Sequence, residues 1–250
     1  METVYRQTLV LSEAHTDESG FLSGSGALSL AQNAAQAHCD ALGLTRAALE
    51  KKGLFWAIAR QRLEITRLPK GGETVTVVST PLPETHTAYP RMTVCTDSRG
   101  KPLFSVTALW VLMDLHTRQM LPPGKSDIRI PCILPGPAPV YPRALAPVSP
   151  QSETVHAVTG SDLDENGHVN NARYLDWVLS LLPHRIGSCR IDLCYTAETI
   201  LGQSVHLCQC LNGDTFQVDG YRDTGAGTAP QRVFSARITQ PEPAPDFADP

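Results

Sequence analysis

Two segments of the chain carry apolar residues at helical spacing, and each follows a short polar turn. In residues 27–42 the apolar positions recur every three or four residues, which places them on one face of a helix. The same spacing recurs in residues 171–182, where Pro183 ends the run. We expect a long helix in each half of the chain. Antiparallel strands are expected after them, at 62–77, 104–114, 190–207 and 234–240.

The polar turns ahead of the two helices are similar in sequence. The run "TDESGFLS", residues 16–23, aligns with "LDENGHVN", residues 163–170, and both keep an acidic pair and a glycine at matching positions. The later strands and the turn signals between them correspond in order as well. No βαβαβ alternation occurs, so we expect an α+β fold in which two tandem units share one core.

A proline-rich segment, "PCILPGPAPVYPRALAPVSP", separates the two units and has no helical or strand-like period. Such a composition is typical of an extended, semi-rigid connector. We expect an N-terminal unit at 1–125, a linker at 126–151, a C-terminal unit at 152–240 and a disordered tail at 241–250.

Composition restricts the class of protein. A formal net charge of −4 gives no overall attraction to nucleic acid or to an anionic membrane. No apolar run reaches the roughly 18 residues of a membrane span, and the N-terminus lacks a signal sequence, so we expect a cytoplasmic protein. The seven cysteines include no CxxC pair, which favours buried apolar cysteines in a reducing compartment over a zinc site.

The two turns differ at the positions where chemistry is possible. The second turn has Asn166 and His168 where the first has Ser19 and Phe21. If the turn itself required an amide and an imidazole, both turns should carry them. Because only the second does, we expect Asn166 and His168 to act on a substrate. An amide can position a carbonyl or a water, and an imidazole can move a proton near neutral pH. The helix start behind them would offer backbone N–H groups to a developing negative charge.

Other polar residues nearby allow two interpretations each. Asp164 either holds Asn166 in place or serves only the turn. Asn170 and Asn171 have the character of helix caps. Glu198, in the mostly uncharged run "CYTAETILG", is either a buried general base or a surface acid at a strand end.

Three longer runs carry a resemblance to a known family: "SDLDENGHVNNARYLDW", "YTAETILGQSV" and, in the first half, "FWAIARQRLEITRLPKGGETVTV". They are similar to acyl-ACP thioesterases, the bacterial relatives of the plant enzymes that release fatty acids from acyl carrier protein (ACP). The resemblance covers about residues 1–240 and implies a double hot-dog fold, two tandem units each with a long helix wrapped by an antiparallel sheet. It assigns the catalytic roles to Asp164, Asn166, His168 and Glu198.

The resemblance implies hydrolysis of a fatty acyl-ACP thioester, with release of free fatty acid and holo-ACP and without a metal or dissociable cofactor. The acyl chain would lie in an apolar tunnel lined by the helix at 27–42. The implied substrate-binding residues are Trp56, Val169 and Asn170.

The chain departs from the plant members of this family at two positions. They often carry Gln at the position of Gly167 and Cys at that of Thr199. Because Thr199 supplies no thiol nucleophile, water attack assisted by Glu198 is favoured over a covalent acyl-enzyme. The division of roles between His168 and Glu198 stays open.

The partner implied by the resemblance is an acidic carrier protein, which a local basic patch would dock despite the overall negative charge. The candidates for this patch are Arg46, Lys51, Lys52, Arg60, Arg62, Arg67 and Lys70. Two fused units already satisfy the pairing that single hot-dog proteins obtain by dimerising, so monomer and homodimer both stay open.

Three alternative functions fit parts of the pattern. An acyl-CoA thioesterase on the same fold would differ at the docking patch. A hot-dog dehydratase or hydratase needs an acid and a base at a hydroxyacyl carbon, which the Asn-x-His spacing fits less well. A non-catalytic acyl sensor would be expected to carry a DNA-binding helix-turn-helix and a basic face, and the sequence shows neither. The preferred length of the acyl chain does not follow from the sequence.

Overall fold

The strands of the molecule come in two sets, one from each half of the chain. The computed structural model describes residues 3–133, 139–225 and 228–240. The first half supplies β1 (Tyr5–Val10), β2 (Leu54–Ile65), β3 (Thr74–Pro81), β4 (Tyr89–Asp97), β5 (Pro102–Asp114) and β6 (Met120–Leu121). The second half supplies β7 (Ser152–Ala157), β8 (Cys189–Tyr195), β9 (Ser204–Asn212), β10 (Thr215–Arg222) and β11 (Gln231–Thr239).

All of these strands join one antiparallel sheet, in the order β1-β3-β4-β5-β2-β8-β11-β10-β9-β7, with β6 paired to β5. Each half has the same internal order when it is followed from its own outer edge: β1-β3-β4-β5-β2 matches β7-β9-β10-β11-β8. The innermost strands, β2 and β8, pair with each other from Arg60↔Cys194 to Ile65↔Cys189 and so connect the halves. The expected α+β fold of two tandem hot-dog units is confirmed.

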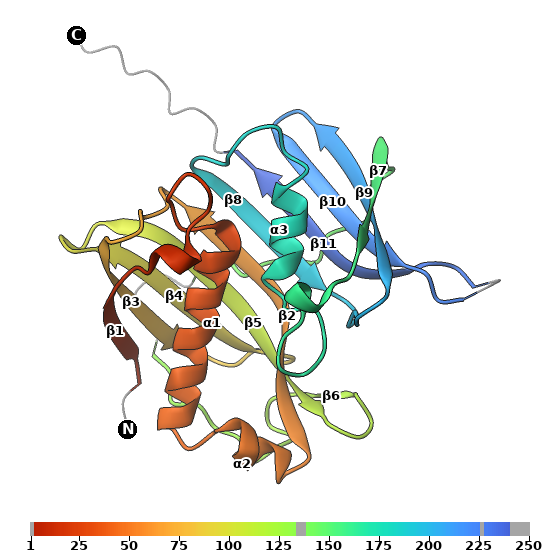
Figure 1. The fold of residues 1–250 in the computed structure, drawn as a ribbon. Helices are drawn as coiled ribbons and strands as arrows, with labels where there is room; N and C mark the ends of the chain where they lie inside the picture. Colours follow the sequence, from red (N-terminus) through yellow and green to blue (C-terminus); the bar gives the residue numbers. More distant parts are fainter. Residues whose placement is uncertain (1–2, 134–138, 226–227, 241–250) are drawn as a thin grey trace.

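Two main helices lie on the same face of this sheet (Figure 1). The first, α1 (Gly24–Ala41), begins three residues before the expected 27 because the Ser23 hydroxyl caps it, accepting from the Gly26 amide at 2.9 Å. Its buried face is rich in alanine, which lets the helix lie close to the sheet. A shorter helix, α2 (Arg46–Glu50), follows directly.

The second main helix, α3 (Arg173–Leu179), is shorter than the expected 171–182. It starts late because Asn170 Oδ1 binds the Ala172 amide at 2.9 Å in a turn of its own. Beyond Leu179 the backbone continues in tight turns, in which the Leu182 amide donates to the Leu179 carbonyl. The expected long helix is therefore present in the first unit, and the second unit has a short one.

One hydrophobic core lies between the helices and the sheet and draws on both halves, as expected. Its fully buried members include Leu28, Leu63, Phe104, Leu175, Ile191 and Phe234. Five of the seven cysteines are buried and all seven are free, which agrees with their interpretation as small apolar residues. No helix in the described ranges has the length and hydropathy needed to cross a membrane.

The segment between the two strand sets has neither helix nor strand in its described parts, up to residue 133 and from 139 to 151. It packs on the face of the sheet opposite the helices, where the Ala146 carbonyl accepts from Gln217 and the Val148 amide donates to Asp219. This contact covers polar side chains of β10 that would otherwise face solvent. The tail expected at 241–250 lies outside the described residues.

Candidate active site

Residues 163–169 form a tight loop around the side chain of Asp164. Its Oδ1 accepts from the backbone amides of Asn166, at 2.8 Å, and His168, at 3.3 Å. Gly167 has a φ of 77°, a left-handed conformation that closes the loop and that other residues adopt only with strain. Asp164 therefore serves the turn and, through Oδ2, also holds the Asn166 side chain.

The Asn166 side chain lies on the outside of this loop. Its Nδ2 donates one hydrogen to Asp164 Oδ2 at 3.2 Å. An amide nitrogen carries two hydrogens, so the second can be given to a substrate oxygen. Asn166 is exposed, so a bound ligand can reach it.

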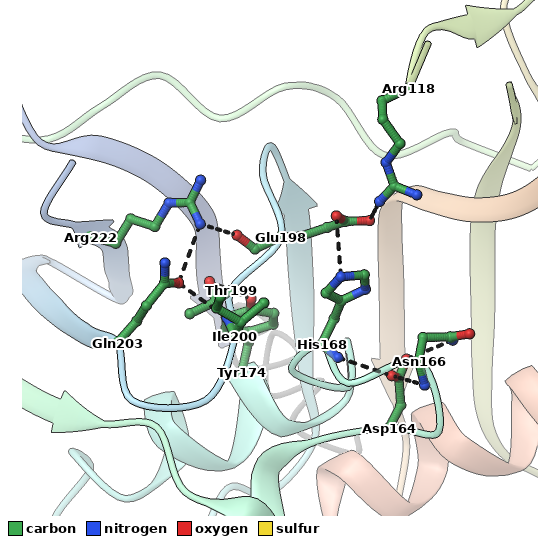
Figure 2. Close-up of polar contacts among 10 residues, drawn as sticks. All are labelled: Arg118, Asp164, Asn166, His168, Tyr174, Glu198, Thr199, Ile200, Gln203 and Arg222. Carbon is green, nitrogen blue, oxygen red and sulfur yellow. Dashed lines mark hydrogen bonds and ion pairs between the residues drawn. The ribbon is translucent and has the colours of Figure 1, made fainter. Parts of the chain in front are cut away.

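Glu198 approaches this loop from the turn between β8 and β9. Backbone pairing brings the segments together, since the Val169 amide donates to the Thr199 carbonyl at 2.8 Å and His168 bridges Ile200. As Figure 2 shows, the Glu198 carboxylate faces the imidazole, with Oε2 3.5 Å from His168 Nε2. The two side chains are 48% and 31% exposed, so both are open to solvent.

Arg118, which the sequence pattern did not single out, completes the cluster from the other half of the molecule. Its guanidinium pairs with Glu198 Oε1, which leaves Oε2 toward His168 (Figure 2). Its guanidinium also lies over the Phe55 ring, 4.6 Å from the centroid. Arg118 belongs to the turn between β5 and β6, and nothing in the sequence indicates that this turn meets residue 198.

The backbone of Arg118 is strained. Its φ of 56° is the one positive value at a non-glycine residue in the part of the chain that the structure describes. Asp114 holds the turn, since its Oδ1 accepts from the amides of His116 and Thr117 and its carbonyl accepts from Arg118. Those amide bonds, with Thr117 contributing most, lower the pKa of Asp114. A strained residue held in this way is typical of functional sites.

The turn that carries Glu198 is fixed from two sides (Figure 2). Arg222 of β10 donates to the Glu198 carbonyl at 2.7 Å and to Gln203 Oε1 at 3.2 Å. Beneath it, the Tyr174 hydroxyl of α3 donates to Thr199 Oγ1 at 2.9 Å. Burial raises the pKa of Tyr174 to about 12, so this hydroxyl remains a donor at neutral pH.

The expected substrate-binding residues lie in two different places. Val169 is buried in the main core, and Asn170 Oδ1 caps the start of α3. The Arg173 amide also donates to Asn170, through the carbonyl, so the helix start offers fewer free donors than expected. Trp56 packs against a second apolar cluster that includes Tyr89 and Leu112, and it lines a cavity under α1.

The expected basic patch is only partly available. Arg62 is 9% exposed and forms a two-point ion pair with Asp192 on the face covered by the linker, so its inclusion was wrong. Arg67 pairs with Glu73. Arg46 is half exposed and pairs with Glu50 and with Glu165, in the candidate loop. Within the described ranges, no cluster of three or more His, Cys, Asp or Glu side chains is arranged to bind a metal.

Comparison with protein families gives matches over most of the chain. Residues 2–123 match the acyl-ACP thioesterase N-terminal domain, and residues 146–233 match the C-terminal domain of the same enzymes. Among curated proteins, an acyl-[acyl-carrier-protein] hydrolase of Cuphea viscosissima is 24% identical over 64% of this chain and 43% of its own length. A dodecanoyl-[acyl-carrier-protein] hydrolase of Cinnamomum camphora is 25% identical over 76% and 55%. The chain thus spans about half the length of these relatives.

Solved structures show the same fold over nearly the whole chain. An acyl-ACP thioesterase of Bacteroides thetaiotaomicron superimposes with a TM-score of 0.80 at 22% identity, covering 95% of this chain and 97% of that one. A 12:0-ACP thioesterase of Umbellularia californica gives a TM-score of 0.74 at 19% identity, covering 96% and 97%.

Proposed function

The chain belongs to the acyl-ACP thioesterase family, and on that premise we propose that it hydrolyses the thioester of a fatty acyl-ACP. The products are a free acid and holo-ACP. The observation that carries the proposal is the meeting of Glu198, His168 and Asn166 at an exposed surface, with Arg118 fixing the carboxylate. The matching loop of the first half lacks all of these groups.

The proposed reaction is direct attack of water on the thioester carbonyl. Glu198 takes a proton from the water as its oxygen bonds to the carbonyl carbon. The second Nδ2 hydrogen of Asn166 stabilises the negative charge on the carbonyl oxygen. The C–S bond then breaks, and the proton passes from Glu198, with His168 beside it, to the departing pantetheine sulfur. Thr199 is buried, and its hydroxyl accepts a hydrogen bond from the Tyr174 hydroxyl, so it takes no part as a nucleophile.

The acidic carrier would dock beside α2, where exposed basic side chains lie next to the candidate loop. Arg46 reaches the candidate loop through Glu165, at 2.8 Å, and Lys51 and Lys52 follow it on the surface. A carrier carboxylate can replace Glu165 as the partner of Arg46. Electrostatic docking of this kind acts mainly on the rate of association and weakens with salt.

The direct test is thiol release from matched panels of acyl-ACP and acyl-CoA thioesters. We expect Glu198→Gln and His168→Ala each to lower kcat by about a hundredfold or more while leaving the melting temperature nearly unchanged. Glu153→Gln is the matched control, because Glu153 forms an exposed pair with His206, at 2.7 Å, and contacts none of Asn166, His168 and Glu198. Equal activity of all four proteins would contradict the proposed site.

The carrier assignment is tested separately from the chemistry. If the chain acts on acyl-ACP, the double variant Arg46→Glu and Lys51→Glu should raise KM for acyl-ACP several-fold and leave acyl-CoA turnover unchanged. Turnover of CoA esters alone would favour the alternative, an acyl-CoA thioesterase. Binding of acyl ligands without turnover would indicate a sensor. Light scattering on the same samples decides between a monomer and a homodimer.

A further inference from the structure

Arg91 is a buried cation that has no anionic partner in the described part of the chain. The residue is 4% exposed on β4. Its Nη1 donates to Ser79 Oγ at 3.1 Å and lies 3.0 Å from His38 Nδ1, and Nη2 lies 4.0 Å from Cys39 Sγ. None of these partners is a carboxylate. Since buried charges in proteins are normally paired, the arrangement lacks a negative charge.

The atoms that lack partners near Arg91 are all hydrogen-bond donors. Trp56 Nε1, Trp110 Nε1 and Gln32 Nε2 are buried and form no hydrogen bond within the described residues. An indole nitrogen can only donate, and the amide nitrogen of glutamine can only donate as well. A buried donor without an acceptor destabilises the fold, because it has lost its hydrogen bonds to water. The missing component is therefore an acceptor, and beside Arg91 an anionic one.

These donors line two adjacent cavities on the inner face of the first-half sheet. Arg91 and Trp110 line both cavities, Trp56 lines the first, and Gln32 lines the second. Trp110 of β5 is directly opposite Tyr89 of β4 in the sheet register. Tyr89 is two residues before Arg91, so the side chains of Tyr89, Arg91 and Trp110 lie on the same face. The Trp56 ring packs edge-on against Tyr89, with centroids 4.9 Å apart.

Hydrogen bonds connect the lining of the second cavity to the segment that follows the candidate loop. Gln61 lines this cavity, and Gln61 Oε1 lies 3.0 Å from the Tyr195 hydroxyl. That hydroxyl is also 3.0 Å from the carbonyl of Asn171, three residues after His168. An acyl chain whose thioester lies beside His168 would have to follow this line of contacts to reach Arg91.

The lining of the first cavity includes one carboxylate, that of Glu84. Glu84 is exposed on the loop after β3 and forms no ion pair with Arg91. Desolvation on burial lowers the pKa of the Arg91 guanidinium, which a bound anion would counteract.

We propose that the acyl group of the substrate carries a carboxylate at its far end, bound by Arg91 with the N–H groups of Trp56 and Trp110. The substrate class is then the ACP thioester of a dicarboxylic acid. This inference rests on the proposed function for the thioester end and adds the recognition of the opposite end. A plain hydrocarbon end would leave every one of these donors unsatisfied.

Hydrolysis of paired substrates tests the inference. We would prepare straight-chain acyl-ACP thioesters of increasing length, each in a plain form and in a form with a terminal carboxylate. Wild type should show a higher kcat/KM for the carboxylated member at one or more lengths. Arg91→Met should lower that value by about ten- to a hundredfold, and should leave the plain member unchanged or improve it.

Arg237→Met is the matched control, because Arg237 lies on β11, donates to Gln217 Oε1 at 3.0 and 2.8 Å, and lines neither cavity. It should leave both substrate forms unaffected. A wild type that prefers the plain member at every length would overturn the inference while the thioesterase function stands. Equal turnover of terminal-hydroxyl and terminal-carboxylate members would also overturn it, since the charge would not be recognised.

A binding measurement covers the case of a protein without turnover, which would refute the proposed function alone. Acyl-pantetheine amides do not hydrolyse, and Trp56 and Trp110 report their binding by fluorescence. Wild type should bind the carboxylated amide about tenfold or more tightly than the plain one, and Arg91→Met should abolish that difference. Equal affinity of the two amides for wild type would refute the carboxylate site.

Discussion

The loops at 16–22 and 163–169 have nearly the same backbone and different chemistry. In each, an aspartate side chain accepts from amides two and four residues ahead: 2.9 and 3.3 Å for Asp17, 2.8 and 3.3 Å for Asp164. Gly20 and Gly167 both have a φ of 77°. Each loop also bridges the turn of its own half, at Phe21↔Lys70 and His168↔Ile200.

The side chains on this shared backbone differ where the chemistry is expected. The two bridges place Leu68 at the position that corresponds to Glu198, and Leu68 is buried. In the first loop, Phe21 lies under the Arg185 guanidinium, 4.0 Å from the ring centroid. The same loop thus supports packing in one unit and a polar cluster in the other. Because the aspartate and glycine occur in both loops, they are scaffold, and the amide, imidazole and carboxylate are the groups to which the proposed catalysis is assigned.

The largest effect is expected from giving the second loop the side chains of the first. Asn166→Ser combined with His168→Phe should lower kcat by at least about a hundredfold, because the proton-transfer group and the carbonyl donor are both lost. The shared backbone should keep the melting temperature within a few degrees. Acyl-ACP hydrolysis and thermal denaturation measure the two quantities. The reverse exchange, Ser19→Asn with Phe21→His, should retain full activity, and a loss there would mean that the first loop also contributes to the reaction.

Removing Arg118 should have the next largest effect on activity. Arg118→Gly deletes the guanidinium and relieves the positive φ, so kcat should fall about tenfold while stability changes by no more than about 1 kcal/mol. Steady-state kinetics and urea denaturation check this pair of results. Arg118→Lys keeps a charge and should recover part of the rate. An unchanged kcat in the glycine variant would show that the reaction does not require the ion pair between Arg118 and Glu198.

Alanine substitutions at Asp17 and Asp164 should lower stability equally and should differ in their effect on activity. Each alanine substitution should lower the free energy of unfolding by about 1–2 kcal/mol, and only Asp164→Ala should also lower kcat, by about tenfold. Burial raises the pKa of Asp17, but hydrogen bonds from Ser19 and Phe21 and the charge of Arg185 outweigh it, and the net shift is downward.

The sign of that shift predicts how the contribution of Asp17 depends on pH. A carboxylate with a lowered pKa stabilises the fold above its unfolded value of about 3.9, and this stability is lost as the pH falls through the folded value. The stability difference between wild type and Asp17→Ala should therefore persist at pH 7 and shrink below about pH 4. Urea denaturation across this range measures it, and a difference that grows in acid would contradict the sign.

The smallest contrast is expected at the two glycines. A methyl group meets no atom within 4 Å at Gly20 or Gly167, so the cost of alanine comes from the positive φ alone. That cost is about 1–2 kcal/mol at either position. Thermal denaturation of Gly20→Ala and Gly167→Ala should give equal shifts. Unequal shifts would show that the loops differ in backbone strain as well as in side chains.

Much of the arrangement of the candidate site was predictable from the sequence because its parts lie close together along the chain. The periodicity and the internal repeat determine the α+β fold and the matching turns. The contrast of Asn166 and His168 with Ser19 and Phe21 marks the chemical loop. Asp164 supports this loop through bonds that span only two to four residues, which a local pattern can indicate.

Only the tertiary structure shows that Arg118 reaches Glu198, 80 residues later, or that Arg62 is buried against Asp192. It also shortens the second helix and places Arg91 among donors that lack an acceptor. The sequence by itself determined the local geometry, because the Asx turn, the glycine and the cap act over a few residues. The tertiary structure decided which charges are paired, because pairing depends on which strands become neighbours in the sheet.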